Sequence, residues 1–167
     1  MDARLQVLLE AALVPLAVGV IWYNPYLLGR LWGSGIGIAK EKMTAGKVAV
    51  ISVVSIIAGY YIAGSLSSIV IHQHGIYGML AGDPDMKDKS SALYNIVQGL
   101  MDKYGNNYRT FKHGAFHGMF TGLKLALPIL AVLGFAESKK ISWILIHAIY
   151  WTICLSVMGG IVCAYMP

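Results

Sequence analysis

Histidine and lysine side chains interrupt the third apolar run of this chain, and they are the groups there best able to bind a metal ion or carry a proton. His113, His117, Thr121 and Lys124 all fall within the stretch HGAFHGMFTGLK. At about 100° per residue in an α-helix, the four side chains share one face. Two histidines spaced four residues apart suit a shared Zn²⁺ or similar ion. The stretch predicts a metal site, a polar path through a membrane, or a polar contact between helices.

A second histidine pair, His72 and His74, follows the second apolar run, and the third run begins near residue 111. The end of one span and the start of the next lie on the same side of a membrane. We therefore expect His72 and His74 to approach His113 and His117 as a metal or haem site, with Glu10, Asp83 or Asp85 as further ligands. The alternatives are solvated interfacial histidines, helix-helix hydrogen bonds and the absence of any cofactor.

Glu10 is a further ionisable side chain inside an apolar run. Counted at 1.5 Å per residue, Glu10 and His117 lie at similar depths, about 8 and 9 Å from the side that carries the termini. The two side chains are therefore predicted to meet. Such a pair either fixes the register of two helices or takes part in function.

Lys124 lies deeper, about 20 Å from the same side. Pro128 removes the helix hydrogen bond that the Lys124 carbonyl would accept, so we expect a bend there. Tyr60 and Tyr61 of the second run are predicted to reach the lysine, and the alternative is that its side chain extends toward the opposite interface.

The composition indicates an integral membrane protein. The chain has 57% hydrophobic and 13% charged residues and a mean hydropathy of +0.63, which is too apolar for a soluble domain of 167 residues. The net charge of +5 belongs mainly to connecting segments, where it suits lipid headgroups rather than nucleic acid.

Four apolar runs predict a single all-α membrane domain, a four-helix bundle with spans at residues 5–23, 48–71, 111–135 and 141–165. Apolar residues at three- and four-residue spacing predict a short amphipathic helix at 91–104, capped by Ser90 or Ser91. We expect this helix to lie on the membrane surface or to cover the end of the bundle. An aromatic turn ends the first span at the interface, and its residues are Trp22, Tyr23, Pro25, Gly29 and Trp32.

Small residues recur every four positions in the last two spans and predict close helix packing. The two sets are Gly114, Gly118 and Gly122, and Ser156, Gly160 and Ala164. The spacing leaves open whether the helices pack within one chain or between copies.

Both termini are predicted on one side of the membrane, side A, with side B opposite. Positive residues divide evenly between Arg4, Lys87, Lys89, Lys103, Arg109 and Lys112 on side A and Arg30, Lys40, Lys42, Lys47, Lys139 and Lys140 on side B. Since charges in short loops have the stronger influence, we expect side B to be cytoplasmic and the termini to be non-cytoplasmic.

Three stretches together resemble a known family. They are GVIWYNPYLLGRLW at residues 19–32, the glycine-spaced FHGMFTGLKLALP, and WILIHAIYWTICLSVMGGIVCAY near the end. The chain resembles an uncharacterised family of small bacterial four-span membrane proteins with a Trp-Tyr-x-Pro turn after the first helix. The resemblance implies this fold and a place in the bacterial inner membrane, and it implies no activity.

The sequence argues against an enzyme, because it has no nucleophile elbow, phosphate-binding glycine loop, Cys-x-x-Cys pair or zinc-protease motif. The leading hypothesis is a protein that acts by assembly, as a homo-oligomer or as an accessory subunit of a larger membrane complex. The second is translocation of protons, cations or a metal ion along Glu10, His113, His117, Thr121 and Lys124. The third is a metal- or haem-binding membrane module.

Overall fold

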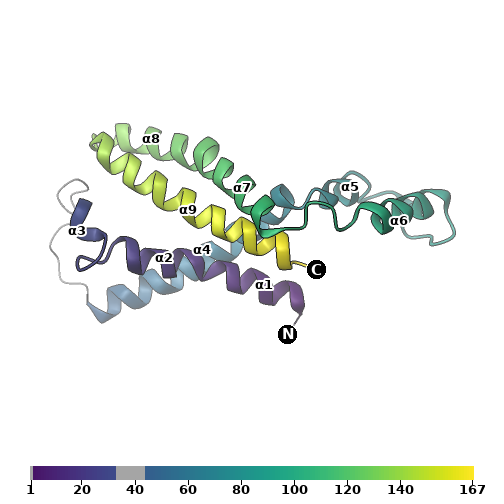
Figure 1. Ribbon diagram of the computed structural model, residues 1–167, viewed down its shortest axis with the longest axis horizontal. Coiled ribbons are helices and arrows are strands. Elements are labelled where there is room, and N and C mark those ends of the chain that lie inside the picture. The colour runs from purple at the N-terminus through teal and green to yellow at the C-terminus, as the bar shows by residue number, and fades with distance from the viewer. Residues whose placement is uncertain (1, 33–43) are drawn as a thin grey trace.

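The computed structural model describes residues 2–32 and 44–167, so Lys40 and Lys42 of the predicted side B loop lie outside it. Within these ranges the chain is all-α, which confirms the predicted class. Four helical spans are long and apolar enough to cross a membrane, namely Ala3–Trp22, Ala45–Val70, Phe111–Ala136 and Ile141–Tyr165. Figure 1 shows both termini at the same end of the bundle.

The first span consists of two helices, α1 (Ala3–Ala12) and α2 (Val14–Trp22), which meet at Leu13. Pro15 is one of the first two residues of α2 and has no N–H to donate to Ala11, so the continuous helix pattern stops there. Asp2 caps the start of α1 by accepting a hydrogen bond from the Arg4 N–H at 3.1 Å. The predicted interruption at Pro15 is therefore present.

The third span also changes its winding in the middle. It runs from α7 (Phe111–Thr121) through a π-helical segment, η2 (Gly122–Ala126), into α8 (Leu127–Ala136). Pro128 is the second residue of α8 and has no N–H to donate to the Lys124 carbonyl. The Leu127 N–H bonds the Gly122 carbonyl five residues earlier, so the chain accommodates the proline by widening one turn.

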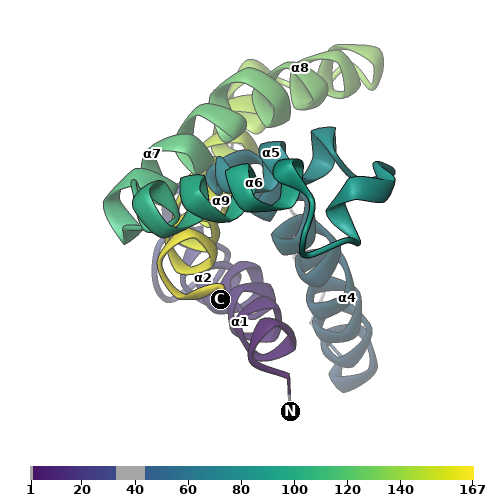
Figure 2. The ribbon, with the colours of Figure 1, turned by 90° about the vertical axis from the view of Figure 1, so that its right-hand side faces the viewer.

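The last span, α9 (Ile141–Tyr165), forms the centre of the bundle and holds more buried residues than any other described helix. Figure 2, viewed along the bundle, shows α9 between α7 on one side and α1 and α2 on the other. Gly118 lies directly against the Leu155 backbone of α9, and Gly114 lies against Gly159. The small-residue seam of α7 therefore packs within the chain and against α9.

The second span, α4 (Ala45–Val70), packs against α1 and α9 along one side only. Gly59 gives this close approach, because a Cβ there would lie 2.5 Å from the Ala12 carbonyl oxygen. The opposite side of α4 is apolar and exposed, for example at Val50 and Val54. In a membrane that side contacts lipid or another protein.

The aromatic turn after α2 directs one aromatic side chain into the core and leaves another exposed. Trp22 is 9% exposed and packs near Tyr150, whereas Tyr26 is 88% exposed. Gly29 begins the short helix α3 (Gly29–Trp32), and a side chain there would collide with the Tyr23 carbonyl oxygen at 2.5 Å. Trp22 therefore packs in the core at the end of the first span.

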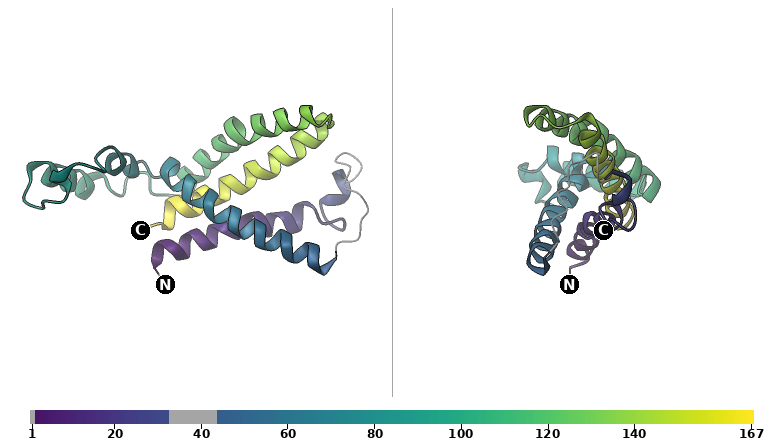
Figure 3. Two further views of the ribbon diagram at one scale, coloured as in Figure 1. Left: turned by 180° about the vertical axis from the view of Figure 1, so that it is seen from behind. Right: turned by 90° about the vertical axis from the view of Figure 1, so that its left-hand side faces the viewer.

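The long connection between α4 and α7 forms an arm of three short helices, α5 (Gln73–Met79), η1 (Pro84–Met86) and α6 (Ala92–Tyr104). The Ser91 side chain accepts from the Tyr94 N–H at 3.0 Å, which confirms the predicted cap. Figures 1 and 3 show the arm extending beyond the end of the bundle, with α5 beside α6. The predicted amphipathic helix is present, but it does not cover the bundle end.

Candidate metal centre

Three histidines meet where the arm joins the bundle. His72 follows the end of α4, while His113 and His117 occupy successive turns of α7. One ring nitrogen from each side chain lies within 4.8 Å of the others. The Nε2 atoms of His72 and His113 are 3.0 Å apart, and the His113 and His117 ring centroids are 4.5 Å apart. His72 is exposed and the other two are half-buried.

Several backbone features position α7 for this meeting. Thr110 caps the helix by accepting from the His113 N–H at 3.2 Å. Gly114 and Gly118 then hold α7 against α9, which turns the adjacent histidine face toward the end of α4. Tyr108 precedes the helix with a φ of 62°, an uncommon value for a residue other than glycine, and its ring stacks on His113 at 5.1 Å.

His74, the fourth histidine predicted for the site, is not in the group. It lies in α5, beyond His72, and is half-buried. Burial lowers the pKa of His74, and the positive charges of Arg109 and Arg4 lower it further. The α5 helix thus separates two histidines that are only two residues apart in sequence.

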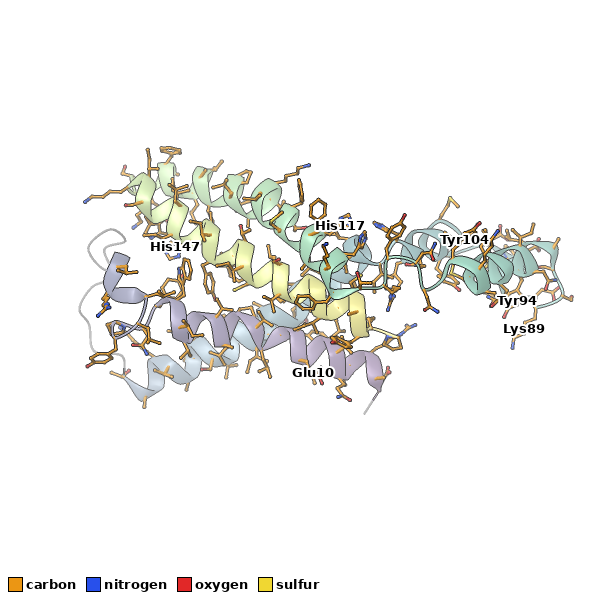
Figure 4. The ribbon with its side chains drawn as sticks, viewed as in Figure 1. Glu10, Lys89, Tyr94, Tyr104, His117 and His147 are labelled. Atoms are coloured by element: carbon orange, nitrogen blue, oxygen red, sulfur yellow. The ribbon has the colours of Figure 1, made fainter. Side chains whose placement is uncertain are left out.

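Glu10 does not meet His117. Its carboxylate accepts from the Gln6 Nε2 at 2.9 Å, within α1. Figure 4 shows Glu10 and His117 on opposite sides of α9. The two side chains were predicted to meet because they lie at similar depths, but depth does not determine the direction in which a side chain points.

Thr121 and Lys124 also lie apart from the three histidines. The Thr121 hydroxyl donates to the His117 carbonyl of its own helix at 2.9 Å. The exposed Lys124 ammonium lies 4.9 Å over the Phe120 ring. Tyr60 and Tyr61, its predicted partners, pack edge to face on each other with ring centroids 5.8 Å apart. The polar face on α7 is therefore not a continuous path within the part of the chain that is described.

The spacing of the histidine nitrogens suits a small ion. Two imidazoles bound tetrahedrally at 2.0–2.1 Å from Zn²⁺ have nitrogens about 3.3 Å apart, close to the 3.0 Å between His72 and His113. A haem held between two histidines needs nitrogens about 4 Å apart with a flat ring between them. The same 3.0 Å separation also fits a direct hydrogen bond between two neutral imidazoles. The geometry thus favours an ion or a hydrogen-bonded group over a haem between these two rings.

The other end of the bundle holds a second histidine contact, which the sequence did not predict. The Tyr23 hydroxyl and the His147 Nδ1 are 2.7 Å apart, and Trp143 packs on the His147 ring at 4.4 Å. Tyr150 packs on Tyr23 and donates its hydroxyl proton to the Pro15 carbonyl at 2.7 Å. These contacts fasten the turn after α2 to α9, as Figure 4 indicates by the place of His147 beside that turn. His147 is thus a packed residue, and the similar depths of Tyr23 and His147 were the only signal of the pair in the sequence.

Comparison with known protein families agrees with the resemblance noted in the sequence. Comparison with curated proteins and with solved structures gives no match for this chain. The profile of one family, described as "Protein of unknown function (DUF1761)", matches residues 7–163. That region contains all three histidines of the group and the Tyr23–His147 pair. The chain therefore belongs to the DUF1761 family of proteins of unknown function.

Proposed function

We propose that the protein binds one transition-metal ion through His72, His113 and His117, and that it acts by binding rather than by catalysis. The observation that carries the proposal is the meeting of three ring nitrogens, from two segments distant in sequence, within 4.8 Å. Imidazole nitrogens suit Zn²⁺, Cu²⁺, Ni²⁺ and Fe²⁺. An ion bound here would link the end of α4 to α7 on side A, the side that carries both termini.

Packing at the site supports an ion over three histidines bonded only to one another. A neutral imidazole has one donor and one acceptor, and a group of three such rings can share protons between them. However, His72 is exposed at the base of the arm, where water can satisfy its nitrogens without help. Holding three exposed or half-buried rings in close contact is more favourable when an ion occupies the space between them.

The test is metal analysis of protein purified from its membrane with a tag that contains no histidine. We expect about one zinc or similar ion per chain, and a Kd that rises on the order of 100-fold or more in His117→Ala, since even outer-shell changes cost 10–100-fold. His74→Ala and His147→Ala are matched controls, because both histidines lie outside the group. Absence of metal from the wild-type protein, together with no uptake of added Zn²⁺ or Co²⁺, would contradict the proposal.

Assembly with another membrane subunit or a second copy is a second candidate function, and Lys124 is the observation that favours it. The glycines that first suggested assembly pack against α9 within the chain. Lys124, in contrast, is exposed near the middle of its span. An ammonium at that depth requires water, a route to the interface or an acceptor on a neighbouring protein. A separate, largely apolar pocket of about 420 Å³ lies beside this part of the third span, lined by Tyr61 of α4 and Ile129 of α8 among others, and it offers surface against which an apolar helix can pack.

Native mass spectrometry of gently extracted protein tests this second candidate. We expect a mass above that of one 18.1 kDa chain, and we expect Lys124→Met to reduce it to the single chain. Lys139→Met is the control, since Lys139 lies in a loop 3.5 Å from Glu137. A wild-type protein that runs as a lone monomer would exclude assembly of this kind.

A further inference from the structure

The three-histidine group offers an incomplete set of ligands for a divalent ion. Structural zinc sites have four protein ligands, whereas sites with three keep a position open for an exchangeable ligand. Across residues 2–32 and 44–167, the group that can hold an ion contains only the three imidazoles. Cys163, a nearby thiol, is buried and donates to the Val70 and Tyr108 carbonyls at 3.4 and 3.3 Å. Three neutral ligands leave both positive charges of a divalent ion uncompensated.

A pocket of about 260 Å³ adjoins this group. His72 belongs to both the pocket and the histidine group, and Tyr108 lines the pocket while stacking on His113. The other walls are largely apolar and include Ile76 of α5 and Leu100 and Met101 of α6. A molecule in this pocket therefore has apolar walls around it and a metal ligand at one edge.

Gln73 fixes the shape of the pocket. Its side-chain Nε2 donates to the Tyr104 carbonyl at 3.1 Å and to the Asn107 carbonyl at 3.0 Å. These two hydrogen bonds join the start of α5, directly after His72, to the end of α6. The pocket is thus built by the arm itself, from residues of α5, α6 and the segments beside them. Figure 4 shows Tyr104 at the end of α6 that is nearer the bundle.

We propose that the pocket takes a small carboxylic acid with an apolar body. The carboxylate would occupy the open position of the bound ion and compensate its charge, while the apolar body would lie against Ile76, Leu100 and Met101. The inference rests on the proposed metal-binding function. It extends that function from holding an ion to recognising a ligand through the ion.

The Co²⁺-loaded full-length protein provides the test, because the visible spectrum of Co²⁺ reports a change of ligand. Benzoate and acetate are the probes. We expect both to change the spectrum and benzoate to bind about tenfold more tightly, since burying roughly 60 Å² of additional apolar ring gives that factor. Met101→Trp, which fills the pocket, should abolish the preference for benzoate. Ile96→Trp is the control on the same helix, since Ile96 is exposed and does not line the pocket.

The outcomes separate the two proposals. Failure of Co²⁺ to bind, or binding that His117→Ala leaves unchanged, would overturn the metal centre itself. Co²⁺ binding that depends on His117, with a spectrum that neither probe alters, would leave the metal centre standing and overturn the ligand pocket. Equal affinity for the two probes, or a benzoate preference retained in Met101→Trp, would also overturn the pocket.

Discussion

The two ends of α9 hold histidines in opposite ways. On side B, His147 is bonded to the Tyr23 hydroxyl at 2.7 Å and covered by Trp143. On side A, His72, His113 and His117 lie against each other, and one of them is exposed. Aromatic rings pack on histidines at both ends, on His113 through Tyr108 and on His147 through Trp143. The difference is that a hydroxyl takes the ring nitrogen of His147, whereas the ring nitrogens of the side A histidines face one another. Residue type alone therefore does not separate a packing histidine from a candidate ligand, but the chemistry of its neighbours does.

The same comparison concerns how tightly each end is held. The side B pair lies between two spans and joins them directly. The side A group depends on α7 remaining against α9 and on the arm holding His72. We therefore expect metal binding on side A to respond strongly to pH and to substitutions that disturb the packing of α7. Substitutions at the side B pair should leave metal binding unchanged.

The largest expected effect is that of pH on metal affinity. Imidazole binds a metal only in its deprotonated form, and histidine normally titrates near pH 6.5. Below that range, protonation of each histidine ligand lowers the metal affinity by about tenfold for each unit that the pH falls. Three ligands therefore lower it by up to about 1000-fold per unit. Zn²⁺ competition titrations from pH 7.5 to 5 should show the affinity falling as the pH is lowered, and falling less steeply in His72→Ala, which has one ligand fewer. A pH dependence that is the same with and without His72 would show that this residue is not a ligand, and His147→Ala should leave the wild-type dependence unchanged.

The next effect tests the glycine seam that supports the side A group. An added methyl group in Gly118→Ala would meet the Leu155 carbonyl and the Ser156 backbone of α9. We expect a loss of about 3 kcal/mol in the free energy of unfolding, at the upper end for overpacking, together with weaker metal binding. Gly64→Ala is a matched control in α4, where an added Cβ meets nothing within 4 Å. Equal stability of the two variants in detergent would show that α7 can shift away from α9 without consequence.

Sequence reasoning predicted the elements of this fold well, because each depends on local chemistry. The spans follow from runs of apolar residues, and the breaks near Leu13 and η2 follow from Pro15 and Pro128, which remove specific hydrogen bonds. The cap at Ser91 follows from a side chain that accepts from a nearby N–H. Each of these features is determined by residues within a few positions of one another.

The candidate site was predicted only in part, because it depends on the rotation of one helix about its axis relative to another. Spacing placed His113 and His117 on one face, and depth brought His72 to the same level. The same arguments also selected Glu10 and His74, which the structure places elsewhere. Neither spacing nor depth reveals that the α7 seam faces α9 and that α5 begins immediately after His72. Those contacts are long-range and decide which of the candidates meet.

At the side B end, Tyr23→Phe is expected to have a moderate effect on stability and none on metal binding. The substitution removes the hydroxyl that pairs with the His147 Nδ1 and leaves a half-buried ring without that partner. We expect a loss of about 1 kcal/mol in the free energy of unfolding, measured by thermal denaturation in detergent. Tyr26→Phe is the control, because Tyr26 is 88% exposed. A change in zinc affinity in Tyr23→Phe would show that the two ends of α9 are coupled.

The smallest expected effect concerns how the arm positions His72. Gln73→Ala removes two hydrogen bonds to the Tyr104 and Asn107 carbonyls, both at an exposed position. Exposed hydrogen bonds contribute free energy at the low end of the usual range for a hydrogen bond. We therefore expect the zinc Kd to rise about threefold, which corresponds to roughly 0.6 kcal/mol. The spectrum of bound Co²⁺ should be retained. Gln6→Ala, which removes the bond to Glu10 in α1, should leave the Kd unchanged. An unchanged Kd in Gln73→Ala would mean that the end of α4 alone holds His72 in place, and the arm would then serve the neighbouring pocket rather than the ion.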